Sequence, residues 1–260
     1  MLYAYDNGGK KCARVSEAFT AGAGGKVIHA SRGIQPGAVA LYGLLRGLAP
    51  IWYAAKQHRR AWYYLDNAYF GRDRYFRVTR GAMQWQGIGA TPVGSKRLTD
   101  LALPWADWRR GGGHILIVQQ SPAWYEFVGH RSREAWTQRT IAAIERHTDR
   151  PIRIRPKDTH RALVDDLFDC WATVTHSSNV AIDGLIQGVP AFVAANSSAA
   201  APGFWTDGQA PALTDLSQIE KPERRADRWR WACYVAAQQW TLDEMRAGDC
   251  WRALQSEATQ

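Results

Sequence analysis

The fold of this chain is constrained most by residues 171–194, WATVTHSSNVAIDGLIQGVPAFVA, which read as strand, helix and strand without a spacer. Trp171–Thr175 is a short segment rich in β-branched residues and ends at polar residues, as is typical of a buried strand. His176–Asn179 supplies side chains that cap a helix N-terminus, and the apolar pattern that follows ends at a Gly-Val-Pro signal. A second apolar run, Ala191–Ala195, comes at once. Two strands joined by one helix run parallel, so the stretch predicts a right-handed crossover whose helix N-terminus can bind an anion.

The residues before this stretch repeat the same alternation. Strands are predicted at His114–Gln119 and Pro151–Arg155, with a loop after the first strand. Helices are predicted at about Ser132–His147 and at His160–Phe168, the second with Leu163, Val164 and Leu167 buried. Alternating strands and helices indicate a parallel sheet that is covered on both faces and binds its ligands beyond the carboxyl ends of the strands.

The N-terminal half shows a weaker version of this pattern. A helix is expected within Leu44–His58 although Pro50 interrupts it, and Gly81–Trp108 has no sustained periodicity. From Glu220 onward the pattern suggests one or two closing helices. The fold class predicted is α/β, with two Rossmann-like parallel-sheet halves at 1–110 and 111–260 and helices at the C-terminal end of the second. Strand candidates in the first half are Leu2–Tyr5, Lys26–Ala30, Ala38–Tyr42, Ala61–Leu65 and Tyr75–Val78.

Charge and aromatic content leave the class of partner open. The formal net charge is +9, which suits a polyanionic partner, small phosphates or simple solubility about equally. Many of the 13 tryptophans lie beside arginines, as in Arg228-Trp229-Arg230-Trp231. Such pairs can stack on nucleic-acid bases and contact phosphates, or they can anchor a protein core with arginines extended to solvent. The interpretation as anchors of a protein core is somewhat favoured.

Cysteine usage and the N-terminal residues suggest a cytoplasmic protein. The four cysteines are scattered without the spacing of a metal site, which favours reduced thiols over a disulfide framework. Met1–Lys11 lacks the apolar core of a secretion signal, and no later run reaches the length of a membrane span. The sequence gives no indication of the oligomeric state.

Small polar groups and two cations follow the four predicted strands of the second half. Because the carboxyl ends of parallel strands meet at one edge of a sheet, these groups should surround one crevice suited to a diphosphate or a nucleotide. Helix capping alone explains Ser177–Asn179 but not the recurrence at four strand ends. The four segments are Gln119–Ser121, Arg155–Lys157, His176–Asn179 and Asn196–Ser198.

These residues carry a resemblance to a known family. R-I-R-P-K, a short helix and then T-H-S-S-N-x-x-I-D-G-L-I-Q-G-V-P look like the nucleotide-sugar-binding half of GT-B glycosyltransferases, especially relatives of the capsular-polysaccharide, Kdo-transferring enzymes and similar bacteriophage proteins. The resemblance covers roughly residues 113–205, and the segment Trp62–Arg72 is similar to a motif of the phage proteins. The chain departs from the family in its shorter halves.

The resemblance implies a donor site in the second half. Ser177, Ser178, Arg155 and Lys157 match the family's donor-phosphate ligands by position, and His176 and Asn179 belong to the same helix start. Gln120 and Ser121 are expected as weaker donor contacts. The family generally uses helix ends and cations, without an essential metal, to stabilise the departing diphosphate. The chain has no D-x-D motif, so we expect no metal and no cofactor beyond the nucleotide-sugar co-substrate.

The reaction also needs a base that removes a proton from the acceptor hydroxyl, at a strand end of the N-terminal half. Asp66, after the Trp62–Leu65 strand, is one candidate, and a turn or cap with Asn67 is its equally plausible structural role. His29, at the end of Lys26–Ala30, is the rival, for which a structural hydrogen bond is the stronger reading.

Three functions fit these observations. The first is sugar transfer from a nucleotide sugar to a hydroxyl of a polyanion. A modified base of phage DNA is the favoured acceptor, because of the net charge and the aromatic residues. This function would place the protein in the cytoplasm of the bacterial host. The second is a glycosyltransferase of surface polysaccharide. The third is a non-catalytic nucleic-acid-binding α/β protein, whose crevice would hold no nucleotide.

Overall fold

The computed structural model of this 260-residue chain describes residues 1–44, 47–84, 94–194, 216–224, 226 and 228–256. It divides into two compact units, the first formed by Met1–Trp85 with Val235–Gln260 and the second by Gln86–Tyr234. The sequence suggested a division between residues 110 and 111, with the closing helices in the second half. In the structure the last helices belong to the first unit instead.

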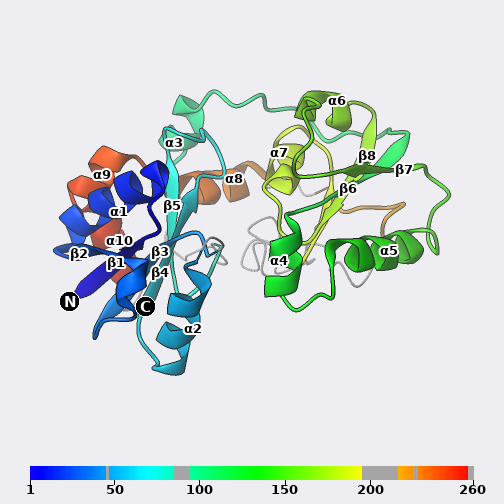
Figure 1. Cartoon of the computed structure of the whole chain (residues 1–260). Helices are drawn as coiled ribbons and strands as arrows, with labels where there is room; N and C mark the ends of the chain where they lie inside the picture. Colours follow the sequence, from blue (N-terminus) through cyan, green and yellow to red (C-terminus); the bar gives the residue numbers. More distant parts are fainter. Residues whose placement is uncertain (45–46, 85–93, 195–215, 225, 227, 257–260) are drawn as a thin grey trace. The chain divides into compact units, whose positions relative to one another are not determined.

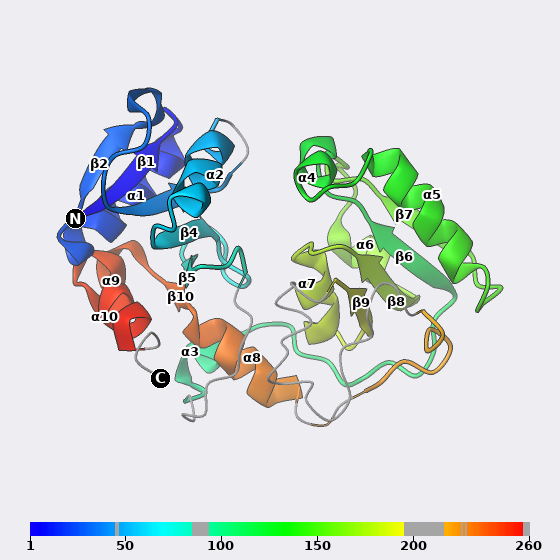
Figure 2. The ribbon, with the colours of Figure 1, turned by 90° about the horizontal axis from the view of Figure 1, so that it is seen from below.

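The first unit contains a six-stranded sheet in the order β10-β5-β4-β3-β1-β2 (Figures 1 and 2). The pairs β1–β2, β1–β3 and β3–β4 are parallel, whereas β5 and β10 pair antiparallel. The Rossmann-like order is therefore present, with an antiparallel extension at one edge that the sequence pattern did not indicate. The strands are β1 (Leu2–Asp6), β2 (Lys26–His29), β3 (Ala38–Tyr42), β4 (Trp62–Asn67), β5 (Phe76–Arg80) and β10 (Gln239–Trp240).

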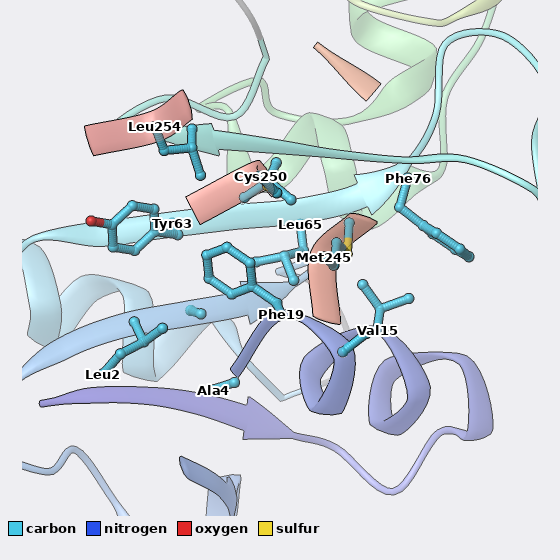
Figure 3. Close-up of a cluster of buried hydrophobic side chains, with 13 residues drawn as sticks. Leu2, Ala4, Val15, Phe19, Tyr63, Leu65, Phe76, Met245, Cys250 and Leu254 are labelled. Carbon is cyan, nitrogen blue, oxygen red and sulfur yellow. The ribbon is translucent and has the colours of Figure 1, made fainter. Parts of the chain in front are cut away.

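One face of this sheet is covered by α1 together with the two last helices, and Figure 3 shows the apolar side chains that join them. Phe19 of α1 packs among Tyr63, Met245 and Leu254, all of which are buried. Closing helices that carry such residues need an apolar partner, and α1 supplies it, which is why they return to the first unit. The helices are α1 (Lys10–Ala23), α9 (Leu242–Arg246) and α10 (Asp249–Ser256).

Two local features of the first unit differ from the sequence prediction. Helix α1 was not predicted, because its N-cap residue is Gly9, which has no side chain to cap it. The helix expected within Leu44–His58 is present as α2 (Ala49–Gln57), where Pro50 lies in the first turn rather than interrupting the pattern. Proline is tolerated there because its missing N–H would have no partner within the helix. Between β2 and β3 the chain also forms a short 3₁₀ turn, η1 (Ala30–Arg32).

The second unit contains a four-stranded, fully parallel sheet in the order β7-β6-β8-β9, so the predicted α/β class is confirmed (Figure 1). The strands are β6 (His114–Val118), β7 (Ile152–Arg155), β8 (Cys170–Thr175) and β9 (Ala191–Val193). The helices between them are α4 (Pro122–Phe127), α5 (Arg133–Ile144), α6 (Leu163–Leu167) and α7 (Val180–Ile186).

Both faces of the second sheet carry an apolar core. Ile115 and Ile117 pack with Trp136 of α5, whereas Leu116 and Val118 pack with Leu167 of α6, so alternate residues of β6 serve opposite faces. Figure 2 shows α5 and α6 on opposite sides of this sheet. A strand that is apolar at every position is typical of such a doubly covered parallel sheet.

Helix α6 corrects one prediction. Val164 was expected to be buried but is 61% exposed, and Asp166 is buried at 2%. Asp166 is held by ion pairs to Arg155 and Arg161. The helix therefore turns an ionised side chain toward the sheet, which an apolar-periodicity argument cannot anticipate.

The remaining helices are α3 (Lys96–Asp100), within the stretch expected to be irregular, and α8 (Arg228–Ala237). Arg228, at the start of α8, lies between the rings of Trp105 and Trp108, with its guanidinium carbon 4.4 and 4.2 Å from their centres. It also donates a 2.6 Å hydrogen bond to the carbonyl of Leu185 at the end of α7. Arginine and tryptophan here fasten the unit internally, as the structural reading of their proximity expected.

Gly22 tests the packing of α9 on α1. A methyl group at this position would lie 1.9 Å from the carbonyl oxygen of Met245. Gly22→Ala should therefore lower the free energy of unfolding by about 1–3 kcal/mol, although helix propensity alone predicts stabilisation by about 1 kcal/mol. Chemical denaturation provides the measurement, with Ala21→Gly at the exposed neighbouring position of the same helix as control. A stabilised Gly22→Ala protein would contradict the docking of α9 on α1.

Candidate functional site

The connectivity of the second sheet marks one place where a ligand fits. From β6 the chain passes to β7 on one side and then to β8 on the other side of β6. The loops that leave the carboxyl ends of β6 and β8 are therefore expected to run to opposite faces, which is the arrangement that places a ligand site at such a switch point. Gln120 follows β6 and Ser177 follows β8, so both lie at this edge.

Gln120 and Ser177 are joined by hydrogen bonds across the switch point. The backbone N–H of Ser177 donates to Oε1 of Gln120 at 3.2 Å, and Nε2 of Gln120 donates to the Ser177 hydroxyl at 3.3 Å. The backbone N–H of Gln120 in turn donates to the Tyr125 hydroxyl at 3.2 Å. Both side chains therefore have a fixed orientation at the edge of the sheet, as a binding residue requires.

His176 adds a neutral imidazole to this group. It is 8% exposed, and its Nδ1 lies 3.1 Å from the Ser177 hydroxyl. The rings of Trp124 and His130 lie edge-on to it, with centroids at 6.3 and 5.7 Å. Burial lowers the pKa of His176 to about 4, with a smaller contribution from His130. Near neutral pH the ring is therefore an uncharged hydrogen-bonding group and not a cation for a phosphate.

Helix α4 brings two further polar groups beside His176. The Ser121 hydroxyl and the Trp124 indole N–H are both buried and have no hydrogen-bond partner among the described residues. Ser121 is the N-cap residue of α4, yet its hydroxyl does not cap the helix. Buried polar atoms without partners carry a free-energy cost that a bound ligand would remove. Trp124 and His130 were missed by the sequence analysis, which placed a loop here, although Ser followed by Pro is a recognisable helix start.

The start of α7 is built differently from the expected cap. Asn179 is the N-cap residue, but its side chain makes no capping hydrogen bond. The Ser178 hydroxyl instead accepts the backbone N–H of Val180 at 3.3 Å. The predicted Ser177, Ser178 and Asn179 thus lie together with His176 and Gln120 at one strand edge, and their role toward donor phosphates stays a prediction.

The two cations predicted for this site lie in different surroundings. Arg155, the last residue of β7, forms an ion pair with the buried Asp166 of α6, whose carbonyl lies 3.1 Å from the His114 ring at the start of β6. Its guanidinium is thus held by a buried carboxylate of α6. Lys157 is exposed and makes no ion pair within the described ranges. Lys157 is therefore able to bind a phosphate without a rearrangement, whereas Arg155 would first have to break its ion pair with Asp166.

In the first unit, Asp66 occupies the carboxyl end of β4. Its Oδ2 accepts hydrogen bonds from the Tyr64 hydroxyl at 3.0 Å and from Nη2 of Arg77 at 2.7 Å. Its Oδ1 accepts the backbone N–H of Asn67 at 2.7 Å. The expected turn-type contact with Asn67 is therefore present, and it leaves the Asp66 side chain 28% exposed. Arg77 was not found from the sequence, because only the register of β5 against β4 places it opposite Asp66.

His29 is placed less favourably for catalysis. It ends the edge strand β2, and its Nδ1 lies 2.8 Å from the Ser31 hydroxyl and accepts the Ser31 backbone N–H at 3.3 Å. The ring caps the short η1 turn, which is the structural role that the sequence analysis considered stronger.

The structure tests three further predictions only within the residues that it describes. Asn196–Ser198, the fourth predicted strand-end segment, lies outside the described residues. His, Cys, Asp and Glu side chains do not gather in threes at metal-binding distance anywhere in the part of the chain that the structure describes. Within the same ranges, no helix has both the length and the apolar character needed to cross a bilayer.

The pKa of His176 predicts a pH dependence of stability. Since it is about 4 in the folded protein and about 6.5 in an unfolded chain, the unfolded state binds an extra proton between these values. The buried neutral ring therefore contributes about 3 kcal/mol to the free energy of unfolding above pH 6.5, and this contribution is lost as the pH falls toward 4. Urea unfolding of wild type and His176→Gln from pH 7.5 to 4.5 should show a shallower slope in the variant, with the exposed His160→Gln as control. Equal slopes would contradict the burial of a neutral His176.

Comparison with known proteins confirms the resemblance at the level of the fold. No family model and no curated protein sequence matches the chain. Among solved structures, the Thermosulfurimonas dismutans KpsC β-Kdo 2,4 transferase is similar with a TM-score of 0.50 and 12% identity, over 92% of this chain and 91% of that one. The KpsC β-Kdo 2,7 transferase from the same organism is similar with a TM-score of 0.51 and 8% identity, over 97% and 99%. The chain therefore has the two-unit, GT-B-like α/β fold of these transferases.

Proposed function

We propose that the protein transfers a sugar from a nucleotide-sugar donor to a hydroxyl acceptor. The observation that carries this proposal is the Gln120–Ser177–His176 network at the switch point of the second sheet. It lies in the unit expected to bind the donor, and the fold is shared with two Kdo transferases over more than nine-tenths of the chain. A fold alone does not define an activity, so the network and its polar groups are the argument for a bound nucleotide sugar.

The chemistry of this network suits the donor. Hydroxyl and amide groups held by one another, beside an uncharged imidazole, form hydrogen bonds to phosphate and sugar oxygens without needing a counter-charge. Of the two sequence-predicted cations, Lys157 is the one that makes no ion pair within the described ranges. A departing nucleotide would gain negative charge at this edge, where fixed donors stabilise it most. In this proposal the reaction needs no metal ion and no cofactor other than the nucleotide sugar.

The acceptor we favour is a saccharide hydroxyl, because the two solved structures that share the fold are named as Kdo transferases. The second candidate is a base of DNA, which the net charge of +9 favours. The aromatic part of that argument is weakened by the structure. Arg150 and Arg224 lie over the Trp171 ring at 4.1 and 4.9 Å, and Arg228 is held between two tryptophans, so these pairs are used inside the protein.

Donor binding is tested by thermal shift with UDP-, GDP-, CMP- and TDP-sugars, with and without duplex DNA and with EDTA present. One of these donors should raise the melting temperature. Ser177→Ala should weaken that binding roughly 10-fold, because it removes a hydroxyl that the network orients. Ser256→Ala, on the exposed end of α10, is the control. Salt-sensitive DNA binding without a response to any nucleotide sugar would overturn the proposal in favour of a nucleic-acid-binding protein.

Asp66 is the proposed base, since its carboxylate is partly exposed at a strand end. Asp66→Asn should lower the transfer rate by a factor of about 100 or more while donor-induced thermal stabilisation persists, because general-base catalysis is worth about that much. His29→Gln serves as the comparison and should retain activity. Transfer is followed by release of the nucleotide. Retained activity in Asp66→Asn, together with its loss in His29→Gln, would assign the base to His29 instead.

A further inference from the structure

The Asp66 carboxylate has two differently occupied oxygens. Oδ2 accepts two hydrogen bonds, one from the Tyr64 hydroxyl and one from the Arg77 guanidinium. Oδ1 accepts a single hydrogen bond, from the backbone N–H of Asn67. Each carboxylate oxygen has two acceptor positions, so Oδ1 keeps one for a further donor.

Arg77 is almost completely enclosed. Its side chain is 5% exposed, and its Nε and Nη1 atoms are buried without a hydrogen-bond partner in the described ranges. Its guanidinium carbon lies 4.7 Å from the Tyr69 ring centre and 5.7 Å from that of Tyr64. Enclosing a cation costs free energy that must be offset by an opposite charge, and Asp66 is the carboxylate that forms an ion pair with it.

The sheet fixes this arrangement. Asp66 and Arg77 are directly opposite residues of the antiparallel pair β4–β5, and Tyr64 lies two residues before Asp66 on the same face of β4. Burial, followed by the charge of Asp66, raises the pKa of Tyr64 well above its usual value, so its hydroxyl remains a donor. Arg77 remains protonated at any accessible pH.

From this geometry we infer that Arg77 and Tyr64 are positioning residues that bind Oδ2 of Asp66 and direct Oδ1 toward the acceptor hydroxyl. The inference rests on the proposed function, in which Asp66 is the base. The acceptor O–H bond breaks as its proton moves to Oδ1, and the acceptor oxygen forms a bond to the anomeric carbon of the donor sugar. The bond from that carbon to the phosphate oxygen breaks, and the nucleotide leaves with the electron pair. Asp66 afterwards releases the proton to water.

This arrangement complicates the simplest test of the base. Asp66→Asn removes the counter-charge of an enclosed guanidinium as well as a proton acceptor. A loss of activity in that variant could therefore follow from unfolding of the first unit. Replacing Arg77 by Met at the same time removes the uncompensated cation with a side chain of similar length.

A double-mutant cycle on stability tests the pairing without reference to activity. Asp66→Asn should lower the melting temperature by roughly 10 °C, and the double variant Asp66→Asn/Arg77→Met should recover most of that loss. The double variant should nevertheless be inactive, because it has no base. Additive losses in the cycle would overturn the inference, and so would transfer activity in the double variant.

Two consecutive tyrosines of β4 provide the kinetic test. Tyr64→Phe removes the hydroxyl that binds Asp66, whereas Tyr63→Phe removes one that accepts a 3.1 Å hydrogen bond from Gln255. Tyr64→Phe should lower kcat roughly 10-fold with little change in KM for the donor, and Tyr63→Phe should leave both unchanged. Equal kcat values for the two variants would overturn the positioning role of Tyr64.

The two proposals fail in different ways. If the wild type transfers no sugar while the stability cycle shows coupling, the proposed function fails and the pairing of Arg77 with Asp66 has only an architectural role. If the wild type is active and the cycle is additive, the proposed function stands and the positioning role of Arg77 fails.

Discussion

The parallel pairing of β6 with both β7 and β8 is the constraint on which the candidate site depends. It requires the chain to leave β6 on one side and return on the other, so the loops after β6 and β8 diverge at the carboxyl edge. Gln120 and Ser177 occupy this divergence and bind each other across it. Had the strands been ordered in sequence, the same residues would have followed strands without a crevice between them.

The structure also shows how the excess of basic residues is accommodated. Arg155 pairs with a buried aspartate, Arg228 lies between two tryptophans, and Arg77 pairs with Asp66 beneath a tyrosine ring. Each of these guanidinium groups is neutralised or stacked inside its own unit. The net charge of +9 already subtracts the two aspartates, so these ion pairs do not change it. The three guanidinium groups are nevertheless engaged within their own units, and this weakens the case that arginines beside aromatic residues contact DNA.

Much of the second unit could be predicted from the sequence, because short apolar or alternating strands follow one another with helices between them. Residues 171–194 fold as their pattern indicated, with Gly188 in the left-handed conformation that ends α7. Other features depend on partners that are distant in sequence. Helix α1 has no capping side chain, so it could not be assigned from local pattern. Closing helices were expected, but the packing of α9 and α10 on the apolar face of α1 could not be predicted.

The candidate site shows the same limit. Strand ends and their polar residues are visible in the sequence, and Gln120, His176 and Ser177 do lie together. The sequence shows that Arg155 and Lys157 are both cationic, but it does not show which of them is already paired. In the structure Asp166 forms an ion pair with Arg155 and not with Lys157. Arg77 and Trp124 were missed because their importance comes from β-register and from a short helix that a loop-like sequence conceals.

The central claim is that a nucleotide sugar binds at the carboxyl ends of β6 and β8, and hydrogen–deuterium exchange measures this most directly. The donor that stabilises the protein should slow exchange in peptides covering residues 119–125 and 176–182. Peptides at the opposite ends of the same strands, around residues 113–115 and 169–171, should be unaffected. Protection confined to other parts of the chain, with these two segments unchanged, would contradict the assignment of the donor site.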